Sequence, residues 1–199
     1  MGEDVINDEN FGDYKETLFE AIKVGRAVYK DGVVDKLRGA LGKNAMNPEH
    51  LFSSVEAILT DEIYDVQENL KRLKEPKKLT AKEKIMSKLK LKDIKKDEAN
   101  KKVPDLTKLS YLSSILLETM AASQKYHTDR GVVRIATPGE TAFFANQYPL
   151  ILQEIDRAAE DGAEFNHCVS DLIGSINGKE TYEWLKEKWI GKDSQKGSD

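Results

Sequence analysis

The residues best spaced for chemistry are Glu164 and His167, which form a Glu-x-x-His pair. On a helix such a pair presents both side chains to one metal ion, as in carboxylate-bridged di-iron bundles. That kind of site needs the motif twice, and the other two histidines, His50 and His127, have no carboxylate at that spacing. We therefore predict no metal and no other cofactor, and keep Glu164 and His167 as weak candidate ligands.

Carboxylates at helical spacing are the second chemical signal. Asp65 could act with Glu62 or with Glu68, and Asp161 with Glu164, in the manner of helical Mg²⁺-dependent hydrolases. Such an enzyme needs two carboxylate-rich helices facing each other across a pocket, with basic groups for phosphate. The same acids fit the solvated faces of amphipathic helices equally well. A metal-dependent carboxylate hydrolase stays an alternative, and no catalytic residue is assigned.

Glu118 is the only charged residue in the stretch 109–124. On so apolar a helix its pKa would be raised, unless an arginine of the following turn or a lysine pairs with it. The interpretation we favour places it on one exposed strip beside Ser114 and Lys125. The chain has no glycine-rich phosphate loop and no Gly-x-Ser-x-Gly elbow, so we expect no enzyme.

Lysines dominate residues 74–102, which contain twelve lysines and five acidic residues within a chain of net charge −4. Lysine without arginine or aromatic residues suits phosphate backbones, acidic proteins or anionic membranes, and suits base recognition poorly. A charged linker is the simpler interpretation. The candidate binding residues for nucleic acid or an acidic partner are Lys77, Lys78, Lys82, Lys84, Lys88, Lys90, Lys92, Lys95 and Lys96.

Composition indicates a soluble helical protein. Hydrophobic residues make up 39% of the chain, charged residues 33% and aromatic residues 8%. Cys168 is the only cysteine, which excludes an intramolecular disulfide and fits a reducing compartment. The acidic start of the chain does not resemble a signal peptide, and no apolar run reaches the roughly 20 residues of a bilayer span. We expect a cytoplasmic protein without a transmembrane segment.

Two apolar stretches predict a central helical hairpin within residues 104–162. Residues 109–124 form its first arm and residues 143–159 its second, with Pro149 either kinking or restarting the second arm. Between the arms, residues 132–136 read as an extended stretch that is too short to make a sheet without a partner strand. The other helical patterns have one apolar face each, so they should pack around the hairpin.

Capping signals predict where several helices begin. Asp13 starts a capping box with Glu16, and Asn47 precedes a proline at the first helical position. Residues 137–140 (Thr-Pro-Gly-Glu) form another capping box, and with Arg134 nearby this helix start could hold an anion. Further helices are expected at residues 33–41, around 165–176 and at 180–190.

We therefore predict an all-α, irregular helical bundle of about six or seven helices. Its expected parts are an N-terminal helical unit (1–73), a lysine-rich linker with a short basic helix (74–103), a C-terminal helical core (104–190) and a disordered tail (191–199). The expected function is that of a non-enzymatic structural, assembly or adaptor protein, of which a viral particle component would be one kind. It would act by protein–protein contact or self-assembly, and phosphate-backbone binding is the first alternative.

Overall fold

The computed structural model describes residues 9–29, 32–74, 85, 91–165 and 178–190, and no strand occurs in these ranges. The prediction of an all-α bundle is therefore confirmed. The helical elements are α1 (Glu9–Val28), α2 (Gly32–Asn44), α3 (Pro48–Lys74), α5 (Leu91–Asp129), α6 (Pro138–Ala142), the π-helical turn η1 (Phe143–Gln147), α7 (Tyr148–Glu160) and α9 (Gly178–Ile190).

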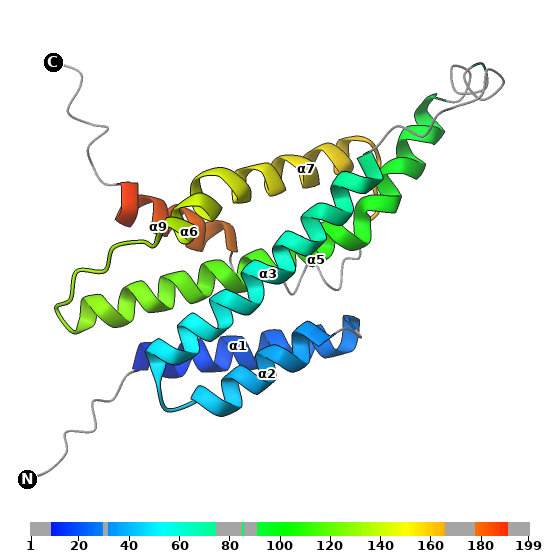
Figure 1. Ribbon diagram of the computed structural model, residues 1–199. Coiled ribbons are helices and arrows are strands. Elements are labelled where there is room, and N and C mark those ends of the chain that lie inside the picture. The colour runs from blue at the N-terminus through cyan, green and yellow to red at the C-terminus, as the bar shows by residue number, and fades with distance from the viewer. Residues whose placement is uncertain (1–8, 30–31, 75–84, 86–90, 166–177, 191–199) are drawn as a thin grey trace, which may run out of the picture.

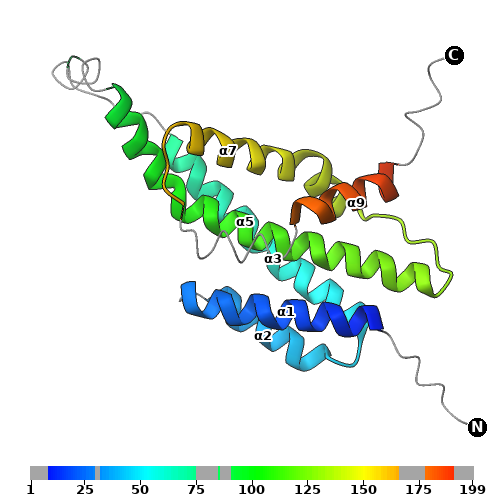
Figure 2. The same cartoon turned by 180° about the vertical axis from the view of Figure 1, so that it is seen from behind.

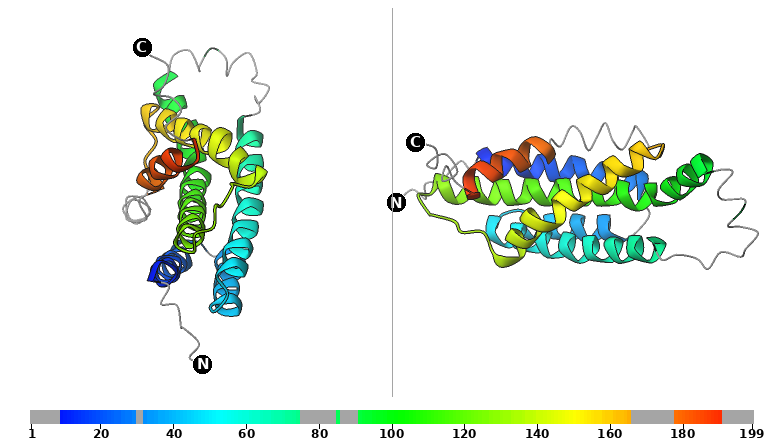
Figure 3. Two further views of the ribbon diagram at one scale, coloured as in Figure 1. Left: turned by 90° about the vertical axis from the view of Figure 1, so that its left-hand side faces the viewer. Right: turned by 90° about the horizontal axis from the view of Figure 1, so that it is seen from above.

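Helix α5 is the centre of the bundle, because α1, α3, α7 and α9 all pack against it. Figure 1 shows α1 and α2 as an adjacent pair below α3 and α5, with α7 and α9 above them. The same layers are seen from behind in Figure 2, and Figure 3 shows α7 crossing α5 diagonally. None of these helices, within the ranges given above, is long and apolar enough to cross a membrane.

Apolar residues of α5 fill the middle of the core, as the apolar stretch 109–124 predicted. Leu112, Leu116 and Leu117 are at most 2% exposed, and α7 packs against the same helix. Buried residues from Phe11 to Leu185 form one hydrophobic cluster. The expected hairpin of residues 104–162 is thus present, and the helices of residues 9–74 pack on it.

Helix α3 joins the hairpin to α2 through the apolar seam that its sequence predicts. Val55, Leu59 and Ile63 recur every four residues and are at most 1% exposed. The start of α3 is also confirmed, because the side-chain oxygen of Asn47 accepts a hydrogen bond of 3.1 Å from the backbone N–H of His50.

Helix α1 begins four residues before the predicted cap, so the expected capping box at Asp13 is wrong. Asp13 lies inside the helix, which starts at Glu9. The extra turn is stabilised by tertiary packing: the Phe11 ring lies 5.9 Å from that of Phe52 and 6.4 Å from that of Tyr126, measured between ring centres.

Helix α5 also extends beyond its predicted start, since it begins at Leu91 and runs through Pro104. Proline removes one main-chain hydrogen bond from a helix interior, and here burial of the following leucines outweighs that loss. Residues 91–103, expected in the linker, are the first turns of this core helix. The predicted boundary between residues 103 and 104 therefore falls inside one helix, while most of residues 75–90 and the 191–199 tail lie outside the described residues.

The second arm restarts at Pro149, which is one of the two outcomes predicted from the sequence. The π-helical turn η1 precedes it, and the N–H of Tyr148 bonds to the carbonyl of Phe143. Because a proline ring clashes with the carbonyl four residues earlier, a wider turn at this place accommodates it. The π turn buries Phe144, whose ring packs 4.6 Å from that of Tyr182 in α9, measured between ring centres.

Candidate functional site

Three charged side chains from distant parts of the sequence meet beside α6. Arg134, in the segment that follows α5, donates a hydrogen bond from Nη2 to Oε1 of Glu140 in α6. The same nitrogen lies 3.8 Å from Oε1 of Glu56 in α3. The side chains of Glu140, Arg134 and Glu56 are 3%, 11% and 21% exposed. We call these three residues the charged cluster.

A helix cap holds Glu140 in place. The backbone N–H of Thr137 donates to Glu140 Oε2 at 2.7 Å, and the backbone N–H of Glu140 donates to Thr137 Oγ1 at 3.2 Å. The capping box predicted at residues 137–140 is therefore confirmed. Because the other oxygen of Glu140 binds Arg134, the anion that neutralises this arginine belongs to the chain itself.

Arg134 also reaches the last described helix. Its guanidinium carbon lies 5.9 Å from the centre of the Trp189 ring, and Trp189 donates a hydrogen bond of 3.0 Å from Nε1 to Oε1 of Gln124 in α5. One side chain thus connects its segment with α3, α6 and α9, and α9 in turn is bonded to α5.

The cluster has an unusual charge state. Burial raises the pKa of Glu56 to about 8, from an ordinary value of 4.5. Repulsion by Glu140 and a hydrogen bond between the two carboxyl groups add to the rise, whereas Arg134 opposes it. Near neutral pH Glu56 is therefore largely protonated, and one arginine neutralises one carboxylate.

A carboxyl group with a pKa near 8 has the acidity of a general acid, but catalysis also needs a cavity in which a substrate can reach it. The hollow between α2 and α3 and the hollow between α1 and α2, both described below, are lined by other residues. Oε1 of Glu56 and Nη1 of Arg134 are buried and make no hydrogen bond to a described residue. The contacts of Arg134 with Glu140 and Glu56 hold the segment that carries this arginine.

That segment, residues 131–137, exposes three aliphatic side chains, Val132, Val133 and Ile135. Val133 is 88% exposed and Ile135 is 83% exposed, and the buried Arg134 lies between them. This alternation at residues 133–135 is typical of an extended chain, and residues 132–137 form neither helix nor strand. The segment is anchored by its inward arginine and exposes three aliphatic side chains, of which Val133 and Ile135 are the most exposed.

The main chain of this segment is also open to a partner. The N–H of Val132 donates to the His127 carbonyl at 2.9 Å, and the N–H of Thr137 is used by the cap. The main-chain groups of Val133, Arg134 and Ile135 make no hydrogen bond to any residue that the structure describes. The segment is not part of a sheet, but unpaired main-chain groups are the kind that accept an added strand where they line a sheet edge.

The raised pKa of Glu56 predicts a pH effect on stability. Between the ordinary pKa of a glutamate and the raised pKa of Glu56, the folded state holds a proton that the unfolded chain has released. The free energy of unfolding should therefore fall as pH rises from about 5 to about 8. Glu56→Gln, which mimics the protonated group, should reduce this fall, as measured by urea denaturation at both pH values. Glu20→Gln, at an exposed position of α1, should not reduce it. Equal pH dependence of the wild type and Glu56→Gln would show that Glu56 titrates normally.

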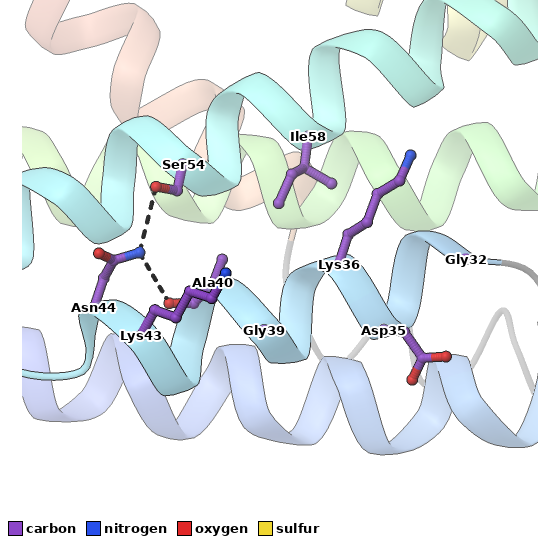
Figure 4. A pocket seen from close by; sticks show the side chains of 9 residues that line it. All are labelled: Gly32, Asp35, Lys36, Gly39, Ala40, Lys43, Asn44, Ser54 and Ile58. Carbon is purple, nitrogen blue, oxygen red and sulfur yellow. Dashed lines mark hydrogen bonds between the residues drawn. The ribbon is translucent and has the colours of Figure 1, made fainter.

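A hollow of about 560 Å³ lies between α2 and α3. Figure 4 shows Asn44 bonded across it to Ser54, and the hydrogen bond is 3.4 Å long. Asp35 and Lys36 point away from each other, and Lys36 binds Glu62 of α3 at 3.0 Å. No pair of acids converges here, so the hollow offers no catalytic arrangement.

The weak metal candidates are not brought together with other ligands. Glu164 is exposed, binds Lys96 of α5 at 2.7 Å, and has its pKa lowered by that lysine. His167 lies outside the described residues. Among the residues that are described, no group of three or more histidine, cysteine, aspartate or glutamate side chains is placed to hold a metal ion.

Two of the paired carboxylates are engaged by lysines. Glu62 contacts Lys36 and Lys108 and so links α2, α3 and α5, while Glu68 binds Lys71 at 2.6 Å. Asp65 is exposed. Glu62 and Glu68 are therefore neutralised by basic side chains of the chain itself.

The structure describes the side chains of two of the nine candidate binding lysines. Lys95 and Lys96 are exposed on the first turns of α5, and Lys96 is the ion-pair partner of Glu164. The side chains of the other seven candidates lie outside the described part of the chain: Lys77, Lys78, Lys82, Lys84, Lys88, Lys90 and Lys92.

Glu118 differs from the interpretation that we favoured. Its carboxylate is half-buried and accepts a hydrogen bond from Thr181 of α9, and burial raises its pKa. Ser114, expected on the same exposed strip, is 4% exposed because the start of α9 covers it at Gly178. The strip beside Glu118 is thus an interface between two helices.

Sequence reasoning did not identify the charged cluster. Glu140 was expected only as a cap, Arg134 near that cap or as a partner of Glu118, and Glu56 not at all. One signal was present, since Arg134 is the single charged residue within the apolar stretch 132–136. Comparisons with protein-family models, curated proteins and solved structures gave no match for this chain.

Proposed function

We propose that the chain is a non-enzymatic structural, assembly or adaptor protein, and that the 131–137 segment is a surface through which it contacts a partner protein. The observation that supports this proposal is the exposure of Val133 and Ile135 on either side of a buried, ion-paired Arg134. Exposed aliphatic side chains that are held in place mark contact sites more often than scattered ones.

The segment suits a partner that is itself extended. An added strand would satisfy the open main-chain groups of residues 133–135, and pockets on the partner would take Val133 and Ile135. The charged cluster fixes the segment before the partner arrives, which lowers the entropic cost of binding. These features support recognition of protein by protein, and none of them requires a cofactor.

Affinity capture from the source cells provides the test. A tagged wild-type chain should enrich a defined protein partner. The amount of that partner captured by the double variant Val133→Ser, Ile135→Ser should be at least about tenfold lower. The reason is that the variant removes the two most exposed aliphatic side chains of the segment while leaving Arg134 and its ion pairs in place. Quantitative mass spectrometry of the captured proteins measures the effect.

The matched control is Leu150→Ser, which removes an exposed aliphatic side chain from α7. This control should retain the partner, and circular dichroism should be unchanged in both variants. Retention of the partner by the double variant would place the contact elsewhere. Loss of all captured protein after nuclease treatment would favour the phosphate-backbone alternative.

A further inference from the structure

A second surface, between α1 and α2, has a different chemistry. A hollow of about 370 Å³ lies between the two helices, with the buried Ile22 and the half-buried Leu41 among its lining residues. Phe19 and Ala27 line it as well, and Phe19 is 57% exposed. We call this hollow the α1–α2 groove. It shares no residue with the 131–137 segment, so the inference drawn from it does not rest on the proposed function.

All the charged residues that line the α1–α2 groove are cations: Lys23, Arg26 and Arg38. Two of them have exposed ion pairs within their own helices, Lys23 with Glu20 at 3.3 Å and Arg38 with Asp35 at 3.5 Å. Exposed pairs of this kind are weak and exchange readily. Arg26 has no ion pair with a residue that the structure describes, so the groove combines an apolar floor with a positive rim.

The shape of the groove suits a helix. Helices α1 and α2 pack side by side, as Figure 1 shows, and the furrow between two adjacent helices accepts the side-chain ridge of a third. A ligand helix with apolar residues three or four positions apart would place them against Phe19, Ile22 and Leu41. Its flanking positions would then lie beside the cations, where acidic side chains are favoured.

We propose that the α1–α2 groove binds an acidic amphipathic helix of a partner protein. The apolar face of that helix covers Phe19 and fills the groove, and its carboxylates pair with Lys23, Arg26 and Arg38. Charge complementarity selects this occupant over a basic helix. A membrane surface is disfavoured because, among the described residues that line the groove, Phe19 is the only large apolar side chain that is more than half exposed.

The test uses a synthetic fluorescent peptide of about 16 residues, with leucine at one face of a helix and glutamate elsewhere. Fluorescence anisotropy should show binding to the full chain, while a peptide with lysine in place of every glutamate should bind at least about tenfold more weakly. Arg26→Glu and Phe19→Ser should each weaken binding of the acidic peptide by a similar factor. Arg157→Glu, the same charge reversal at an exposed position of α7, should not.

Four results would overturn the proposal. The acidic and basic peptides could bind equally, or binding of the acidic peptide could be unaffected by both groove variants. Phosphatidylglycerol vesicles could bind the chain through Phe19 while the peptide does not, which would assign the groove to lipid. Light scattering could instead show Phe19-dependent self-association without peptide binding, which would assign it to a second copy. Because the Val133→Ser, Ile135→Ser variant keeps the groove intact, it should bind the peptide normally.

Discussion

Replacing Arg134 by methionine should lower the free energy of unfolding by about 3–5 kcal/mol, because it leaves buried carboxyl groups without their cation. Glu140 is 3% exposed and has Arg134 as its ion-pair partner, and Glu56 lies beside both. Methionine retains much of the arginine's volume, so the loss would report the missing charge more than a cavity. Urea denaturation at neutral pH measures the change.

The control for this variant is Arg157→Met on the exposed surface of α7, which should change stability by no more than about 0.5 kcal/mol. Adding Glu140→Gln and Glu56→Gln to Arg134→Met should restore part of the lost stability, since the triple variant buries no unpaired carboxylate. A loss below about 1 kcal/mol in Arg134→Met would mean that the cluster is solvated and does not anchor the 131–137 segment.

Replacing Leu116 by alanine should lower the free energy of unfolding by about 2–5 kcal/mol. The side chain lies in α5, against which α1, α3, α7 and α9 pack, so its removal leaves a cavity in the core. Leu116 is 2% exposed. Thermal or urea unfolding of the variant measures the cost.

Leu150→Ala provides the matched comparison, because Leu150 is 59% exposed on α7. The same change in side-chain size should there alter stability by no more than about 0.5 kcal/mol. If Leu116→Ala loses less than about 1 kcal/mol, α5 is not the centre of the core.

Local signals in the sequence predicted much of the fold. The start of α3 after Asn47 and the start of α6 at Thr137 were correct because a cap is made by residues within one turn of each other. The apolar seam of α3 and the apolar middle of α5 were correct because helical periodicity places their side chains on defined faces.

The two wrong helix boundaries are explained by contacts between residues that are distant in the sequence. Helix α1 starts at Glu9 because Phe11 packs on Phe52 and Tyr126. These contacts cannot be predicted from the sequence around Asp13. Helix α5 continues through Pro104, where propensity alone predicts a break. In both places packing energy from distant residues outweighs the local preference.

The candidate site was the least predictable part. Glu56, Arg134 and Glu140 come from α3, from the segment after α5 and from α6, and only the packing of these elements brings the three charges together. The sequence predicted an extended stretch at residues 132–136, and the structure has neither helix nor strand there. The sequence could not predict that the arginine faces two carboxyl groups, because the partner residues belong to other elements.

The central claim is that residues 131–137 bind a partner protein, and amide hydrogen exchange tests it most directly. In the chain alone, the amides of Val133, Arg134 and Ile135 should exchange rapidly, because they are not hydrogen-bonded to any described residue. In the captured complex the same amides should exchange at least about tenfold more slowly. Unchanged exchange at these three amides, with new protection only at other places in the chain, would contradict the claim.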